Sequence, residues 1–187
     1  KNGISISLNK DVTKINVTAE GLELINSDGK KENFDKILTA TGRIPNSDDL
    51  GLDNSGVQIG EKGEILVDNY SKSSKDSVYA IGDVTNRSNL TPIAIREAML
   101  FVDTVFRGKP EKLDYQFVPT AVFTNPEVGT VGLTEEEASQ FAPLEIYTTK
   151  FKSMREGFAG REDRVLMKLI IEEKNQKVLG CHFVSPF

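Results

Sequence analysis

Residues 78–92 read VYAIGDVTNRSNLTP, a short apolar run followed by a glycine, a carboxylate, a polar loop and a helix start. Thr91 can cap the first N–H groups of the helix, Pro92 suits its first position, and residues 93–106 have helical apolar spacing. A helix start carries partial positive charge and free N–H donors, which favour an anionic group in front of it. Asp83 presents a carboxylate that can accept hydrogen bonds from ligand hydroxyls. The segment therefore predicts a site for a large cofactor rather than a small metabolite.

The region before this segment has the period-two apolar alternation that is typical of half-buried strands. It predicts strands at residues 3–8, 12–17, 21–25 and 34–40, with a hairpin turn at residues 27–30, SDGK. Residues 45–63 are rich in Gly, Asp, Asn and Ser and predict a connecting loop. Short strands are expected at residues 64–67 and 78–81.

The region after it predicts one long helix and then a sheet. The helix from Thr91 should end near Arg107, where GKP follows. Strands are expected at residues 120–123, 128–133, 144–151, 164–171 and 178–184, and TEEE at residues 134–137 is a capping box for a short helix to about residue 141. The run VLMKLII at residues 165–171 is apolar enough for a central strand of an antiparallel sheet, with a polar turn at residues 173–177.

Composition excludes several classes of function. A net charge of −5 without a basic cluster argues against nucleic acid as a partner. No apolar run approaches the length of a membrane span, and no signal peptide opens the chain, so a cytoplasmic location is expected. One cysteine, Cys181, excludes an internal disulfide and a zinc site built from several thiolates. The absence of an initiating Met suggests a piece of a longer protein.

Four segments together resemble the pyridine nucleotide–disulfide oxidoreductase family. Residues 79–83, YAIGD, are similar to its second flavin-binding motif, and residues 89–92, NLTP, to the flavin-facing loop of its glutathione reductase branch. Residues 40–46, ATGRIPN, are similar to the junction after its nucleotide domain. Residues 118–133, VPTAVFTNPEVGTVGL, are similar to the opening of its dimerisation domain. The matches come in family order.

This resemblance implies an α/β fold in three partial domains. Residues 1–42 would end an NAD(P)-binding domain, residues 43–117 would be the C-terminal part of an FAD-binding domain, and residues 118–187 would be a truncated α+β dimerisation domain with an antiparallel sheet. The implied cofactors are FAD and NADPH. The residues implied to contact them are Gly42, Gly82, Asp83, Asn89, Leu90, Thr91 and Ala121.

Three of these residues have both a role in the resemblance and a plainer alternative. The Gly42 backbone would lie against the pyridine nucleotide, or Gly42 simply ends a strand in a turn. Asp83 would bind the flavin ribityl chain beside Gly82, or it is a solvated loop carboxylate. The helix start at Thr91 would face the flavin pyrimidine edge, which is compatible with helix capping. Asn89 and Ala121 would lie near the nicotinamide half of the second cofactor.

No catalytic residue and no metal ligand is expected in this sequence. His182 is the only histidine and alternates with its neighbours in a strand, so we expect a hydrogen-bonded structural residue, and Cys181 is expected to be a packed thiol. The family's redox pair has Cys-x-x-x-x-Cys spacing and its acid–base histidine lies in a His-Pro-Thr segment; neither motif occurs here. Met99 lies near a helix position that is Arg in some glutathione reductases, where the arginine helps to bind glutathione; this sequence departs from that pattern.

The resemblance implies a homodimeric flavoenzyme that passes electrons from NADPH through FAD to a cysteine pair and on to oxidised glutathione, and a fragment that is inactive alone. Dihydrolipoamide dehydrogenase and mercuric reductase are the alternatives within the family. A non-catalytic oligomerisation module built from the sheet after Pro119 is the alternative outside the enzymes.

Overall fold

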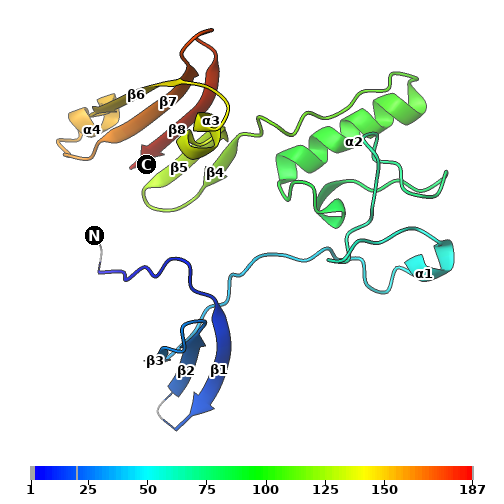
Figure 1. Ribbon diagram of the computed structural model, residues 1–187, viewed down its shortest axis with the longest axis horizontal. Coiled ribbons are helices and arrows are strands. Elements are labelled where there is room, and N and C mark those ends of the chain that lie inside the picture. Colours follow the sequence, from blue (N-terminus) through cyan, green and yellow to red (C-terminus); the bar gives the residue numbers. More distant parts are fainter. Residues whose placement is uncertain (1–2, 20, 187) are drawn as a thin grey trace. The chain divides into compact units, whose positions relative to one another are not determined.

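The computed structural model describes residues 3–19 and 21–186, and these divide into two compact units, Lys1–Ile44 and Pro45–Phe187 (Figure 1). The helices within the described ranges are too short or too polar to cross a bilayer. Each unit is described separately below.

The first unit is a three-stranded antiparallel sheet. It contains β1 (Val12–Thr18), β2 (Gly21–Asn26) and β3 (Lys31–Phe34) in the order β1-β2-β3. The predicted hairpin turn between β2 and β3 is confirmed: the Asn26 N–H donates to the Lys30 carbonyl at 3.0 Å, and Gly29 has the positive φ of 79° that such a turn demands.

Two predicted strands in this unit are wrong. Residues 3–8 have no strand, and the apolar side chains of Ile4, Ile6 and Leu8 are exposed. Residues 35–40 are irregular, with Leu38 92 % exposed, and β3 instead ends at Phe34. A strand needs a neighbour for its backbone N–H and C=O groups, and apolar alternation alone does not supply one. Within the described residues no neighbour pairs with either segment.

The second unit begins with a loop-rich region around a small core. A short helix, α1 (Leu52–Ser55), lies within the predicted loop. The segments predicted as strands at residues 64–67 and 78–81 are wrong as strands: they form only isolated bridges, Ile59 to Ile65, Val67 to Ser73 and Lys72 to Tyr79. The core beneath them consists of Val57, Ile65 and Ala80, with Leu52, Val67, Val78 and Val84 packed against it.

Next come the 3-10 turn η1 (Gly82–Thr85) and the long helix α2 (Thr91–Phe106), which confirms the predicted helix. The aromatic side chain of Phe101 packs edge-on against Tyr79, with ring centroids 5.1 Å apart. Helix α2 is therefore anchored to the segment that immediately precedes η1.

The remaining elements form a five-stranded antiparallel sheet with the order β4-β5-β8-β7-β6 (Figure 1). Its strands match the prediction closely, and β7 is an interior strand as expected. The elements are β4 (Thr120–Val122), β5 (Glu127–Gly132), α3 (Glu135–Ser139), β6 (Leu144–Phe151), α4 (Met154–Phe158), β7 (Val165–Glu172) and β8 (Val178–Ser185). Helix α4 is the one element here that the sequence pattern did not predict.

The capping box before α3 is confirmed. The Thr134 hydroxyl accepts from the Glu137 N–H at 3.2 Å, and the Glu137 carboxylate accepts from the Thr134 N–H at 2.8 Å. The backbone hydrogen bond of Thr134 is the main reason that the pKa of Glu137 lies below its usual value. Helix α3 ends at Ser139, two residues before the predicted end.

The two faces of the sheet differ. Glu135 on α3 pairs with Lys168 of β7, which places α3 on the face that also carries Ile170, a fully buried residue. On the opposite face Met167 lies across from Phe183, and both remain about two-fifths exposed (41 % each). The α3 side is thus closed over Ile170, and the opposite side presents the apolar side chains of Met167 and Phe183.

Candidate functional site

Gly82 and Asp83 are the first two residues of η1, directly after Ile81, whose backbone is extended. Gly82 is buried and has φ of 70°, and a Cβ atom added to it would lie 3.1 Å from the Ala94 Cβ of α2. Both the left-handed backbone and the close approach of α2 therefore require glycine here. The Thr85 hydroxyl donates to the Gly82 carbonyl at 2.8 Å and closes the turn.

Asp83 lies on the exposed side of η1. The turn continues when the Asn86 N–H donates to the Asp83 carbonyl at 3.0 Å, and Asn86 then adopts φ of 51°. Because η1 contacts α2, the Asp83 carboxylate is carried on a short turn packed against the helix rather than on a loose loop.

The helix start differs from the prediction in one respect. Leu90, not Thr91, is the N-cap residue, it has no side-chain cap, and Thr91 and Pro92 are the first two helical residues. The Ile93 and Ala94 N–H groups both donate to the Leu90 carbonyl at 3.0 Å, and Pro92 has no N–H. In the described chain this leaves the Thr91 N–H as the one donor of the first turn without a backbone acceptor.

The other residues expected to contact a cofactor lie on separate segments of the chain. Asn89 is exposed, and its side-chain amide donates to the Asn86 side chain at 3.1 Å, which ties it to the same loop. Ala121 lies on β4 and pairs with Gly129 of β5, and Gly42 lies in an irregular exposed segment of the first unit with φ of 116°. The structure thus places Gly82, Asp83, Asn89, Leu90 and Thr91 on one turn, its loop and the following helix start. The cofactor roles of all seven expected residues, Gly42 and Ala121 included, stay predictions.

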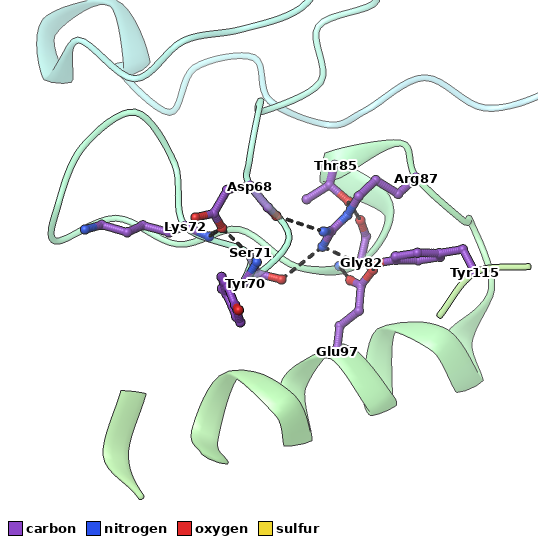
Figure 2. A network of polar contacts seen from close by, with 9 residues as sticks. All are labelled: Asp68, Tyr70, Ser71, Lys72, Gly82, Thr85, Arg87, Glu97 and Tyr115. Carbon is purple, nitrogen blue, oxygen red and sulfur yellow. Dashed lines mark hydrogen bonds and ion pairs between the residues drawn. The ribbon is translucent and has the colours of Figure 1, made fainter. Parts of the chain in front are cut away.

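A buried carboxylate behind η1 was not predicted (Figure 2). Glu97 of α2 is only 2 % exposed, and its Oε2 accepts from the Gly82 N–H at 2.5 Å. Its Oε1 accepts from the Tyr115 hydroxyl and lies 3.2 Å from Nη2 of Arg87. An acid that interrupts the apolar stripe of a helix, between Ala94 and Leu100, was the sequence signal that could have revealed it.

Arg87 joins the loop before α2 to two other segments (Figure 2). Its guanidinium donates from Nη2 to the Ser71 hydroxyl at 3.0 Å and from Nε to Thr85 Oγ1 at 3.2 Å. It also lies over the Tyr115 ring, 5.4 Å from the ring centre. A planar fork of donors can satisfy several acceptors at once, so one arginine holds the whole cluster.

This cluster predicts the ionisation of Tyr115. Burial and the hydrogen bond to Glu97 raise the pKa of the phenol from 10.0 to about 12, despite the opposing charge of Arg87. A folded-state pKa above the unfolded value means that the stabilisation is complete below pH 10 and is lost as the pH rises through about 12. Tyrosinate absorbance is measured against pH in the wild type and in a Tyr115→Phe variant. The difference between the two curves reports Tyr115 and should develop well above the pH range of an ordinary tyrosine. A difference that develops around the ordinary tyrosine pKa would contradict this placement of Tyr115 beside Glu97.

His182 and Cys181 behave as expected of structural residues. The two ring nitrogens of His182 lie 2.5 Å from Thr130 Oγ1 and 3.0 Å from the Leu133 carbonyl. Because a carbonyl only accepts, Nε2 carries a proton, and Nδ1 shares its hydrogen bond with the Thr130 hydroxyl, which can donate or accept. Cys181 is half-buried in β8 and has no disulfide. In the described part of the chain, no group of three His, Cys, Asp or Glu residues is placed to hold a metal ion.

Comparisons with known proteins assign the fold to a family. Residues 1–98 match the family Pyridine nucleotide-disulphide oxidoreductase, and residues 118–187 match its dimerisation domain. The chain belongs to this family. The predicted fold class, part of a dinucleotide-binding flavoprotein region followed by a dimerisation domain with an antiparallel sheet, is thereby confirmed.

Relatives and a solved structure agree with this assignment. The chain is 43 % identical to a glutathione reductase of Pisum sativum described as chloroplastic/mitochondrial, covering 96 % of this chain and 33 % of the relative. It is 41 % identical to a trypanothione reductase of Leishmania donovani, covering 98 % and 38 %. The HOCl-induced flavoprotein disulfide reductase RclA from Escherichia coli superimposes with a TM-score of 0.82 at 25 % identity, covering 94 % and 40 %. The chain therefore spans well under half the length of these proteins.

Proposed function

We propose that this chain is the C-terminal portion of an FAD-dependent disulfide reductase that uses NADPH to reduce oxidised glutathione. The observation that carries the proposal is the packing of the Gly82–Asp83 turn against the start of α2, in a chain that belongs to a flavoprotein family. An exposed carboxylate and a helix start are thus carried on one turn and the helix that packs against it.

These residues fit the ribityl and pyrimidine portions of FAD. Asp83 is exposed and can accept hydrogen bonds from the ribityl hydroxyls, while the bare Gly82 lets the backbone approach closely. The Thr91 N–H and the positive end of α2 offer a donor and a dipole to a polar ring edge that gains negative charge. When bound, FAD would supply the hydride acceptor of the reaction. The role of this chain is to hold and polarise that group.

The second cofactor would be NADPH, and two residues, Asn89 and Ala121, are proposed for its nicotinamide half. In the first unit, the bare backbone of Gly42 is proposed by itself to lie against the pyridine nucleotide. In the second unit, Asn89 shares the loop that carries Leu90 and the helix start. Ala121 lies on the exposed edge strand β4, where its backbone can be reached. Asn89 is thus proposed to contribute from the same loop region as Asp83.

The thiol chemistry would come from outside this sequence. Reduction of one disulfide takes two electrons and two protons, with one hydride from NADPH and one proton from solvent. A redox pair needs two cysteines, and the sequence contains one, whereas the single histidine has both ring nitrogens engaged. We therefore propose that the chain alone is inactive.

The assignment to oxidised glutathione rests on the NLTP segment and on the glutathione reductase relatives. A second candidate substrate is trypanothione disulfide, which the similarity to a trypanothione reductase favours. NADPH oxidation by the full-length protein, with each disulfide and with lipoamide in turn, separates these branches. Turnover with lipoamide alone would overturn the glutathione proposal.

We also propose a homodimer formed through the dimerisation domain. The match of residues 118–187 to that domain and the uncovered apolar side chains of Met167 and Phe183 support it. Helix α3 lies on the opposite face of the sheet, where Glu135 pairs with Lys168, so we propose the face of Met167 and Phe183 for a second copy. A cytoplasmic location stays a prediction.

The FAD proposal is tested by replacing Asp83 in the full-length protein. Asp83→Ala should weaken FAD binding roughly 10- to 100-fold, because hydrogen bonds to a charged acceptor are among the stronger ones in proteins. The dissociation constant is measured from flavin fluorescence on titrating FAD into apoprotein. Asp48→Ala, which removes another exposed carboxylate of the same unit, should leave it unchanged. A wild-type protein that binds no FAD, or equal affinities for wild type and Asp83→Ala, would overturn the proposal.

A further inference from the structure

We propose that Glu97 is the positioning residue of the flavin-binding turn, acting through its hydrogen bond to the Gly82 N–H. This inference rests on the proposed function, because it assigns to a buried side chain the task of aiming Asp83 at FAD. Glu97 itself is 2 % exposed and lies behind the turn, so it does not touch the cofactor side of the site.

The first reason is the burial of Glu97. A carboxylate taken out of water destabilises the fold unless it is paired and hydrogen-bonded. Glu97 meets that requirement with partners on three segments, namely Gly82 in η1, Arg87 in the loop and Tyr115 beyond α2 (Figure 2). An apolar residue would fill the same helix position without any of these partners, so the acid calls for an explanation beyond packing.

The second reason is the position of the hydrogen bond between the Gly82 N–H and Glu97. Gly82 immediately precedes Asp83, and its N–H lies 2.5 Å from Glu97 Oε2, while its Cα lies against Ala94. Two contacts from α2, three residues apart, thus clamp the backbone that carries Asp83. A binding carboxylate must be held to within about 0.5 Å of its productive position, which a turn without such a clamp would not ensure.

The third reason is charge. Glu97 adds a negative charge behind a helix start whose value to a ligand is its positive end. Arg87 lies 3.2 Å from that carboxylate and compensates it, so the clamp leaves the field at the helix start intact. The hydrogen bond to Gly82 and the ion pair to Arg87 are therefore separable, and different substitutions remove them.

The experiment compares Glu97→Gln with Glu97→Asp in the full-length protein. Glutamine keeps the reach and one acceptor oxygen for Gly82 but loses the charge, whereas aspartate keeps the charge but is one methylene shorter. We expect FAD affinity within about threefold of wild type for Glu97→Gln and a loss of roughly tenfold for Glu97→Asp, since an unsatisfied buried donor is costly. The same pair of substitutions at Glu111, an exposed glutamate paired only with Arg96 at 3.9 Å among the ion pairs of the described residues, is the matched control and should change nothing.

A double-mutant cycle with Asp83→Ala separates positioning from a general loss of structure. If Glu97 acts through Asp83, Glu97→Asp should cost almost no further affinity once Asp83 is Ala. Additive losses, or the reverse order with Gln weaker than Asp, would overturn the inference and leave the ion pair or the fold as the role of Glu97. Its failure is distinct from failure of the proposed function, in which the wild-type protein itself binds no FAD or Asp83→Ala has no effect. Peptide hydrogen exchange of residues 78–92 in the Gln and Asp apoproteins reports the clamp independently of FAD: faster exchange is expected for Asp only, and equal exchange in both would count against the inference.

Discussion

A Gly132→Ala substitution should destabilise the five-stranded sheet by roughly 2–6 kcal/mol, the sum of a strained backbone and an overpacked crossing. Gly132 ends β5 with φ of 80° and pairs with Gly180 of β8. An added Cβ would lie 2.2 Å from the Leu179 carbonyl oxygen, a separation that real Cβ atoms do not show. That oxygen already accepts from the Leu133 N–H at 2.9 Å, so it is held in place.

The measurement is hydrogen exchange of β5 and β8 peptides in the full-length protein, together with the denaturant midpoint. Gly157→Ala is the matched control, because Gly157 lies in α4 and the nearest atom to an added Cβ is a lysine side-chain carbon at 3.8 Å. It should be neutral or slightly stabilising, since alanine is the better helix former. Unchanged hydrogen exchange in Gly132→Ala would mean that β5 and β8 do not approach each other this closely.

An Ile170→Ala substitution should cost about 2–5 kcal/mol of unfolding free energy, because it leaves a cavity in the most buried part of the sheet. Ile170 on β7 is fully buried, and its cross-strand neighbour Ile146 on β6 is 37 % exposed. The same substitution at Ile146 removes the same atoms from a site that water already reaches, so it should cost much less.

Chemical denaturation of the two variants, followed by exchange of β7 peptides in the full-length protein, tests this difference. Similar losses for Ile170→Ala and Ile146→Ala would contradict the difference in burial between these two residues on one face of the sheet. The comparison is sharp because both substitutions lie on directly paired residues, so strand propensity and register are held constant.

The strands of the second sheet were predictable because their signals are local. Apolar runs separated by turns marked β6, β7 and β8, and TEEE marked the start of α3 through a capping box that spans four residues. The same alternation misled at residues 3–8 and 35–40, where a strand depends on a neighbour that the pattern cannot show. Local regularity predicts an element only where a partner completes it.

The residues of the Gly82–Asp83 turn were predicted from sequence, but the hydrogen bond from Gly82 to the buried Glu97 was not. Gly82, Asp83 and the helix start lie within ten residues of one another, so a single motif revealed them. The N-cap shifted from Thr91 to Leu90 because backbone angles, rather than side-chain preference, decide where the first helical residue lies.

By itself the sequence determined the long helix, the positions along the chain of the strands of the second sheet, and the glycine and acid of the turn. Those features depend on residues that are close along the chain. Only the tertiary structure decided that Glu97 is buried and holds Gly82, because its other partners Arg87 and Tyr115 lie 10 and 18 residues away. Burial is a property of what surrounds a side chain, so the chain must fold before a charged residue on a helix can hold the backbone of another segment.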